Sequence, residues 1–279
     1  MLSKPASLRV LLHTVLALAL SGCAATEPRT SAVEASVTTR AVGYLSAEAV
    51  PASLLLVPAP PAAGTAAQAL DEEVSRQARA LRGSARFAQA AQDAELGFPA
   101  GANQFSCAID LDVDAQRTPA LYRLLERSRI DASAATRKAK HQYQRARPFM
   151  ANGEPTCTPE DEPALRSNGS YPSGHTAIGW AWALILSEAV PERADAIQLR
   201  GRNYGESRLV CNVHWQSDIL EGRFMGAAAV ARLHDNPDFQ RDLAAARKEI
   251  VAARARGAHS SRDCATEEAV LKVRPASAL

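Results

Sequence analysis

The chain is organised around the stretch SRLVCNVHWQSD, which runs from Ser207 to Asp218 and is followed by an apolar run with helical spacing, residues 219–225. His214 and Asp218 are four residues apart, so on a helix that begins at His214 their side chains share one face. The carboxylate then holds one ring nitrogen of the imidazole and leaves the other free as a nucleophile. Arg208 adds a planar set of donors that suits two phosphate oxygens. By itself the stretch fits a surface His/Asp pair beside an ordinary arginine equally well.

A second stretch, GSYPSGHT at residues 169–176, leads into another apolar run with helical spacing, residues 178–186. Pro and Gly break the chain there, which places Ser173, Gly174 and His175 at a helix N-terminus. The unpaired backbone N–H groups and the positive dipole end of a helix favour a bound anion at this position. The alternative is a plain turn closed by a Ser or Thr helix cap.

The third stretch is basic. Lys140 is followed after six residues by Arg147 and Pro148, with further basic residues at positions 137, 138 and 145. Pro148 is expected to end the helix and to turn Arg147 towards the site. Taken alone, such a segment most often forms a solvated basic face.

Together the three stretches contain the patterns Lys-x6-Arg-Pro, Pro-Ser-Gly-His and Ser-Arg-x5-His-x3-Asp, with no substitution at a signature position. This set resembles the superfamily of type 2 phosphatidic acid phosphatases and vanadium haloperoxidases. Residues 169–176 resemble the signature of the bacterial class A non-specific acid phosphatases, and the likeness runs from about Val42 to about Lys248. Three ordered blocks of specified residues make a chance match improbable.

The resemblance implies an acid phosphatase that needs no metal and no cofactor and that forms a phosphohistidine. His214 is the implied nucleophile, Asp218 orients its ring, and His175 is the general acid and base. The implied phosphate ligands are Lys140, Arg147, Ser173, Gly174 and Arg208. Because one histidine must be charged and the other neutral, a bell-shaped pH dependence with an acid optimum is expected. The expected substrates are phosphomonoesters of many kinds: nucleotides, sugar phosphates and aryl phosphates.

The composition fits one large globular domain, because 279 residues with 47% hydrophobic residues can bury a sizeable core. A net charge of +2, interspersed charges and 5% aromatic residues argue against a nucleic-acid partner. The periodicity predicts an all-α multi-helix bundle of the acid phosphatase and haloperoxidase type without strands. Helices are expected at 67–82, 84–96, 118–143, 175–189, 191–204, 214–235 and 239–254, with an extended apolar segment at 54–61. A homo-oligomer is also expected.

Residues 1–23 read as a bacterial lipoprotein signal, with a positive start, a short apolar core and small residues before Cys23, which is the predicted lipidation site. The alternative is ordinary secretory cleavage after Ala24 or Ala25. Either interpretation exports the protein, with a lipid-anchored periplasmic location at the outer membrane favoured over a soluble periplasmic or secreted one. Residues 24–41 are a predicted flexible tether, 42–256 the phosphatase domain, and 257–279 a disordered tail.

Four further cysteines fit an exported protein with up to two disulfides, and three pairings are possible. We predict Cys107 with Cys157 and Cys211 with Cys264. A zinc site at Cys211 and His214 is not expected, because no second pair of ligands accompanies them.

Three other functions are less consistent with the sequence. A membrane lipid phosphatase requires several transmembrane helices, and no apolar segment of about 20 residues follows the signal. A vanadium haloperoxidase would hold vanadate in an equivalent pocket, but residues 169–176 and the modest chain length favour the phosphatase. A non-catalytic phosphate-binding lipoprotein fits poorly with an intact nucleophile and acid.

Overall fold

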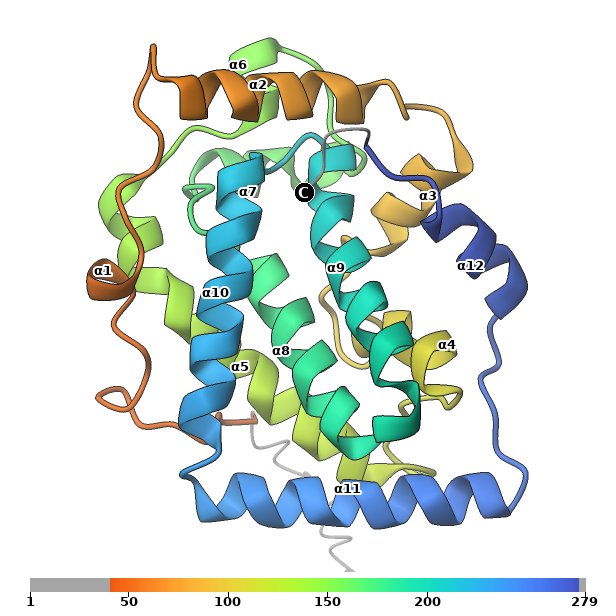
Figure 1. Ribbon diagram of the computed structural model, residues 1–279. Coiled ribbons are helices and arrows are strands. Elements are labelled where there is room, and N and C mark those ends of the chain that lie inside the picture. Colours follow the sequence, from red (N-terminus) through yellow and green to blue (C-terminus); the bar gives the residue numbers. More distant parts are fainter. Residues whose placement is uncertain (1–40, 276–279) are drawn as a thin grey trace, which may run out of the picture. The chain divides into compact units, whose positions relative to one another are not determined.

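The computed structural model describes residues 41–275, and within this range the regular structure consists of helices alone (Figure 1). The helices of eight or more residues are α2 (Ala66–Arg79), α3 (Ala85–Gln92), α5 (Pro119–Tyr143), α8 (Gly174–Ala189), α9 (Ala194–Val210), α10 (Gln216–Leu233), α11 (Pro237–Ala255) and α12 (Cys264–Leu271). The shorter elements are α1 (Ser53–Leu56), η1 (Ala102–Phe105), α4 (Ser106–Ile109), α6 (Pro148–Asn152), η2 (Pro159–Asp161), α7 (Glu162–Arg166) and η3 (Pro191–Arg193). The prediction of an all-α fold is confirmed. In the described range, no helix combines the length and the apolar character needed to cross a membrane.

Helix α8 lies at the centre of the bundle. Its residues are apolar on nearly every side, and such a helix is stable only when other elements surround it. The helices α5, α9 and α10 pack against it. Trp182 of α8 is completely buried, and its indole N–H donates to the carbonyl of Leu125 on α5 at 3.0 Å. The central position of α8 fixes where its N-terminus, with Ser173 as the N-cap, opens into the site.

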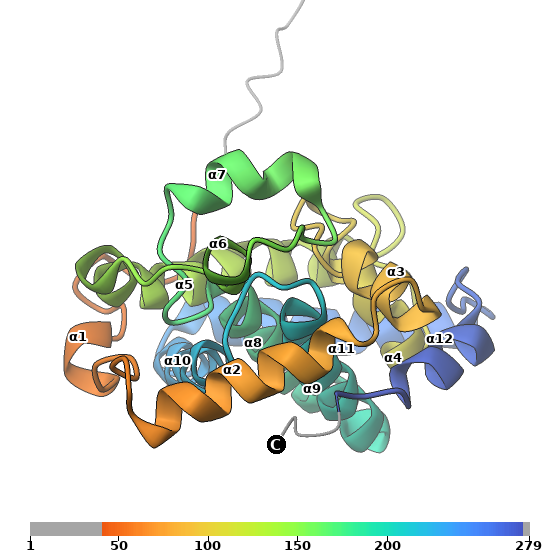
Figure 2. The same ribbon diagram turned by 90° about the horizontal axis from the view of Figure 1, so that it is seen from above.

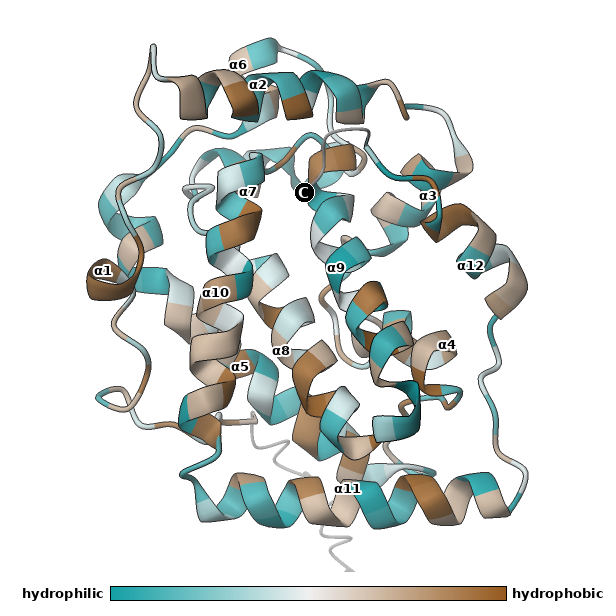
Figure 3. Cartoon of the chain, viewed as in Figure 1, coloured by the Kyte–Doolittle hydropathy of each residue, from teal (hydrophilic) through white to brown (hydrophobic). Residues whose placement is uncertain are grey.

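The outer helices bury one face each. Helix α11 packs across α5 and α8, whereas α2 packs across α9 and α10. In Figure 3, α2 and α11 show hydrophilic and hydrophobic patches in turn, as expected of helices that place one side against the core and the other in water.

Two glycines let α10 approach α8 at backbone distance. A Cβ atom at Gly222 would lie 2.6 Å from the carbonyl oxygen of Ser173, and one at Gly226 would lie 2.5 Å from that of Ala177. Any larger residue must therefore push α10 away from the turn that begins α8. The four-residue spacing of the two glycines places both on the same face of α10.

Several local expectations need correction. Residues 53–56 form the short helix α1, so the segment expected to be extended is only partly so. Helix α9 continues to Val210, beyond the expected end at residue 204. The tail after Gly257, for which disorder was predicted, contains α12 in its described part, and Arg274 donates to Glu206 of α9 at 2.6 Å. The predicted signal, lipidation site and most of the tether lie outside the described residues.

The predicted cysteine pairing is wrong. The disulfides join Cys107 to Cys264 and Cys157 to Cys211. The first ties α12 to α4, and the second ties the segment after α6 to the turn between α9 and α10. Helix packing decides which thiols meet, and the linear order of cysteines carries no information on this.

Replacing both Cys107 and Cys264 with Ser is expected to lower the free energy of unfolding by about 2–5 kcal/mol, because the bond closes a long loop in the unfolded chain. Chemical denaturation of the oxidised proteins, followed by circular dichroism, measures the change. Activity at low temperature should be retained, since neither cysteine is among the predicted site residues. An unchanged denaturation midpoint would contradict this pairing.

Candidate active site

A cavity of about 1030 Å³ opens beside the N-terminus of α8. The predicted site residues that line it are Lys140, Arg147, Gly174, His175, Arg208 and His214. One wall comes from α5, and another from residues of the segment 158–168, which includes α7. Figure 2 shows α7 outside the layer of α5 and α6. The fold therefore brings three motifs that are distant in the sequence to one cavity.

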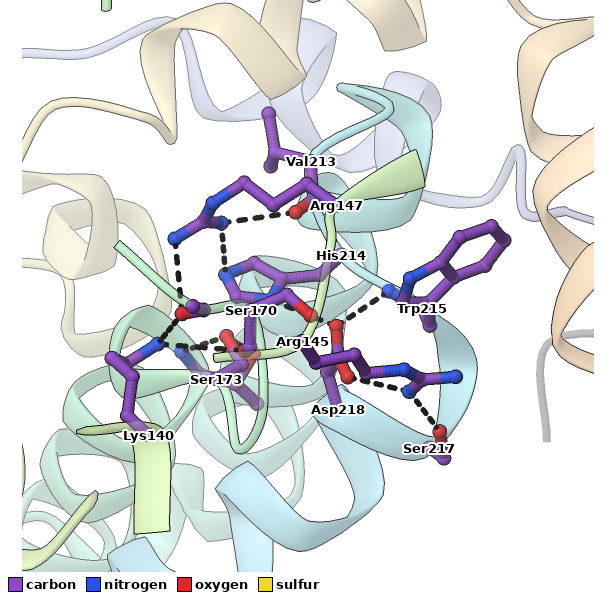
Figure 4. A network of polar contacts seen from close by, with 12 residues as sticks. Lys140, Arg145, Arg147, Ser170, Ser173, Val213, His214, Trp215, Ser217 and Asp218 are labelled. Atoms are coloured by element: carbon purple, nitrogen blue, oxygen red, sulfur yellow. Dashed lines mark hydrogen bonds and ion pairs between the residues drawn. The ribbon is translucent and has the colours of Figure 1, made fainter. Parts of the chain in front are cut away.

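Two cations of the site are held by main-chain carbonyl groups (Figure 4). Lys140 donates from Nζ to the carbonyl of Gly169 at 2.7 Å. Arg147 donates from Nε to Leu165 at 3.0 Å and from Nη1 to Val213 at 3.0 Å. Burial lowers the pKa of Lys140 to about 7 and that of Arg147 to about 10. Because carbonyl groups carry no net charge, both cations keep a strong attraction for an anion.

Arg208 lies in the last turn of α9 and is buried. A cation at this end of a helix is favoured by the helix dipole. Its Nε is buried without a hydrogen-bond partner within residues 41–275. A buried donor of this kind is costly unless something accepts from it, and a phosphate oxygen in the cavity would do so.

His214 and Asp218, the predicted nucleophile and its orienting partner, have a different local geometry from the one predicted. Helix α10 begins at Gln216 with Trp215 as its N-cap, so His214 precedes the helix and does not share a helical face with Asp218. The contact nevertheless forms, with His214 Nδ1 3.2 Å from Asp218 Oδ2. The same oxygen accepts the backbone N–H of Trp215 at 2.8 Å, as a capping carboxylate does.

The hydrogen bonds of His214 define its tautomer. A carboxylate accepts, so Nδ1 carries the ring proton. Nε2 lies 3.2 Å from Nη1 of Arg147, a group that can only donate, so Nε2 presents its lone pair. Burial, followed by the charges of Arg147 and Lys140, holds the pKa of His214 well below its usual range. This imidazole is neutral and has an unprotonated nitrogen facing the cations.

His175 is held by a hydrogen bond from Nε2, whereas His214 is held through Nδ1. Its Nε2 lies 2.6 Å from the carbonyl oxygen of Asp93, so Nε2 donates and Nδ1 is the nitrogen left for chemistry. The ring stacks on Tyr204, with centroids 4.7 Å apart. Burial and then the charge of Arg208 hold the pKa of His175 well below its usual range.

Ser173 connects the two helix starts that form the site. Its hydroxyl accepts the N–H of Thr176 at 3.2 Å, which makes it the N-cap of α8. Its own N–H donates to the carbonyl of Asp218 at 2.9 Å. The predicted placement of Ser173 at a helix N-terminus is confirmed, and the bond to Asp218 sets this turn against the first turn of α10.

Comparison with known proteins agrees with this geometry. Residues 130–240 match the family model described as the PAP2 superfamily. The chain is 45% identical over 199 residues to a non-specific acid phosphatase of Providencia stuartii, covering 71% of this chain and 80% of that protein. It is 40% identical over 210 residues to an acid phosphatase of Zymomonas mobilis, covering 75% and 79%. A non-specific acid phosphatase of Salmonella typhimurium is 43% identical over 199 residues, covering 71% and 80%. The chain belongs to the acid phosphatases of the PAP2 superfamily. Members of this family are phosphoric monoester hydrolases.

In this family member, two buried arginine–aspartate pairs support the histidines, and the sequence analysis missed both. Arg145 does not lie on the solvated basic face that its basic neighbours suggest, because its guanidinium donates to Asp218 at 2.7 Å. Arg200 bonds at 2.5 Å to the carboxylate of Asp93, the residue whose carbonyl holds His175. No local signal could have identified these pairs, because the partners are 73 and 107 residues apart.

The lowered pKa of Lys140 predicts how anion binding depends on pH in this phosphatase. Sulfate keeps a constant charge near neutrality, so above pH 7 its affinity should fall by up to about tenfold per pH unit as Lys140 loses its proton. Calorimetric titration between pH 6 and 9 measures this. Lys140→Met should bind weakly and lose the dependence, whereas Lys138→Met, an exposed neighbour on α5, should keep it. Identical pH dependence in wild type and Lys140→Met would refute the assignment.

Proposed function

We propose that the protein is an exported, metal-independent acid phosphatase that hydrolyses a broad range of phosphate monoesters through a phosphohistidine on His214. The observation that carries this proposal is the state of His214: a neutral imidazole with its Nε2 lone pair beside Arg147 in a cavity lined by cations. The membership in the PAP2 acid phosphatases supports the same reaction class.

The phosphoryl group would occupy the space between Lys140, Arg147 and Arg208, with further donors from Ser173 and the N–H of Gly174. Phosphoryl transfer requires mainly that charge on the non-bridging oxygens is stabilised and that the groups are aligned. Three fixed cations and a helix N-terminus supply both. Lys140 and Arg147 can exchange carbonyl partners for phosphate oxygens.

The reaction then has two steps. Nε2 of His214 attacks phosphorus, the bond from phosphorus to the ester oxygen breaks, and the leaving oxygen takes a proton from Nδ1 of His175. Neutral His175 next removes a proton from water, and the resulting hydroxide oxygen bonds to phosphorus. The N–P bond breaks, which returns His214 to its starting state and releases inorganic phosphate. Asp218 accepts from Nδ1 throughout and stabilises the positive charge on the ring.

The acid optimum follows from the pKa of His175. The free site holds this pKa low, so His175 is neutral there. A bound phosphate ester brings negative charge, which raises the pKa of His175 and lets it carry the proton needed by the leaving group. The opposite protonation states expected for His175 and His214 thus arise in the complex. Lower pH favours this uptake, so activity should decline towards alkaline pH.

A broad substrate range fits the mouth of the cavity. The cavity is far larger than a phosphate group, and beyond the cations its lining combines Arg137 and His141 with Glu160 and Asp161. Such a mixture of charges does not select one leaving group. Nucleotides, sugar phosphates and aryl phosphates are the proposed substrates.

Export is the proposed location, with the signal at residues 1–23 and a lipid on Cys23 that anchors the protein in the outer membrane, facing the periplasm. Two disulfides support an oxidising compartment. A homo-oligomer is proposed as well, and exposed Leu220 and Phe224, four apart on α10, offer an apolar contact.

Hydrolysis in the presence of EDTA tests the reaction. His214→Ala should lose at least about 10³-fold in kcat, since the nucleophile is absent. With glycerol phosphate, whose alkoxide leaving group needs a proton, the kcat of His175→Ala should fall about 10²–10⁴-fold. With p-nitrophenyl phosphate, whose leaving group needs no proton, this variant should release one burst of p-nitrophenol and then stop, because no base activates water. Phosphate label should then accumulate on the His175→Ala protein.

The control is His234→Ala, which removes an exposed histidine paired with Glu188 and should leave the rate unchanged. Turnover that is indifferent to His214 would refute the phosphohistidine. Halide oxidation upon addition of vanadate, without phosphatase activity, would indicate a haloperoxidase.

Replacing Cys23 with Ser should move the protein from the membrane fraction to the soluble periplasmic fraction of the expressing bacterium, because stable anchoring needs the lipid. Immunoblots of the separated fractions measure this. Equal distribution of wild type and variant would exclude the lipid anchor and favour ordinary secretory cleavage.

A further inference from the structure

Arg145 is a buried cation directly behind the nucleophile pair. Its Nη1 donates to Oδ1 of Asp218 at 2.7 Å and to Oγ of Ser217 at 2.7 Å (Figure 4). Its Nη2 donates to Oδ2 of Asp71 at 2.8 Å and to Oε1 of Gln68 at 2.9 Å. The side chain is only 9% exposed. Each terminal nitrogen thus holds one carboxylate, which a planar guanidinium can do and an ammonium cannot.

Asp71 anchors this arrangement from α2. Its carboxylate is 2% exposed and also accepts the backbone N–H of Ser217 at 2.8 Å and the Ser217 hydroxyl at 2.6 Å. These bonds fix α2 to the first turn of α10, where Asp218 is located. Arg145 therefore cannot shift without disturbing contacts on two helices.

We infer that Arg145, anchored by Asp71, is a positioning residue that fixes the orientation and the charged state of Asp218, and through Asp218 the tautomer of His214. Arg145 does not line the cavity, so we do not expect it to contact a phosphate bound there. The inference rests on the proposed function, since it assigns a task in the reaction of His214.

The two oxygens of Asp218 show why the orientation matters. Oδ1 is bonded to Arg145, which leaves Oδ2 for His214 Nδ1 and the N–H of Trp215. If Asp218 were protonated, its hydroxyl could donate to Nδ1, and the ring proton would move to Nε2. His214 would then lack the lone pair that attacks phosphorus. Keeping Asp218 ionised is therefore a condition for the nucleophile.

The surroundings of Asp218 predict the sign of each substitution. Burial raises the pKa of Asp218, and the charge of Arg145 is the largest effect that opposes it, followed by the Trp215 N–H and Lys140. The other titratable groups coupled to Asp218 are Arg147 at the start of α6, Tyr171 before α8 and His214 itself. Loss of Arg145 should raise the pKa of Asp218, whereas loss of the Asp71 charge beyond it should lower that pKa or leave it unchanged.

The test compares kcat, KM and the pH profile of kcat/KM for p-nitrophenyl phosphate, together with sulfate affinity. Arg145→Gln should lose about 10–100-fold in kcat, the loss found when a hydrogen-bond partner that orients a metal-binding side chain is removed. KM and sulfate affinity should stay within about twofold, and the acid limb should move about 1 pH unit towards neutrality. Asp71→Asn should lower kcat less and leave the acid limb in place or shift it to lower pH.

Arg145→Gln leaves two buried carboxylates without their cation, and this change could prevent folding. Two further variants therefore test the same inference. The double variant Arg145→Gln/Asp71→Asn removes one carboxylate with the cation and should still move the acid limb upwards. Arg145→Lys keeps the positive charge but cannot hold both carboxylates as a guanidinium does. The pH of the acid limb should therefore match the wild type, while kcat should fall. Arg123→Gln removes an exposed arginine from its pair with Asp242 and should match the wild type in all four measurements.

The outcomes separate the inference from the proposed function. If His214→Ala keeps the wild-type rate, the proposed function is refuted. If His214→Ala loses activity but Arg145→Gln or the double variant keeps the wild-type kcat and acid limb, only the role of Arg145 is refuted. The role of Arg145 would also be refuted if Arg145→Gln and Asp71→Asn both lost kcat and both shifted the acid limb in the same direction. General damage to the fold would produce that result, whereas the inferred role predicts an upward shift for Arg145→Gln only.

Discussion

The burial of positive charge is the constraint on which the rest of this structure depends. Lys140, Arg147 and Arg208 line one cavity, and taking charges out of water is costly unless other groups compensate. The compensation for Lys140 and Arg147 comes from main-chain carbonyls of residues 165–170 and of Val213. Carbonyl oxygens are neutral, so they hold the cations in place without satisfying their charge. An anion that enters the cavity would supply the negative charge that these carbonyl groups lack.

The carbonyl groups that hold these cations lie mostly in loops, so the loops must be fixed in position relative to the helices. The bond from the Ser173 N–H to the Asp218 carbonyl sets the start of α8 against the start of α10, and Gly222 allows these two turns to approach. The disulfide between Cys157 and Cys211 ties the segment after α6 to the turn that precedes His214. Orientation of the proposed catalytic groups thus comes from links between secondary structure elements rather than from any one helix.

The sequence was sufficient for the fold class and for six predicted site residues that line one cavity. Helix-forming composition and apolar spacing predicted helices that bury one face, such as α2, and α8 was predicted from the chain-breaking residues before it and its long apolar run. Ser173 was placed correctly because the chain-breaking residues before it and the apolar run after it define a helix start. Lys140, Arg147 and His214 were predicted as site residues because their chemistry and spacing suit phosphate, and all three line the cavity.

Tertiary structure alone decided the contacts that orient those residues. The Arg145–Asp71 ion pair joins residues 74 apart, and the first disulfide joins Cys107 to Cys264, 157 residues apart. Such pairs carry no local pattern, since burial and partner choice depend on which helices meet. The start of α10 was misplaced for a different, local reason: Asp218 accepts the N–H of Trp215 from inside the first turn, so the helix begins after Trp215 and His214 lies before it. Spacing in the chain identified the residues that we propose to react, and packing between helices determined their hydrogen-bond partners and the burial that shifts their pKa values.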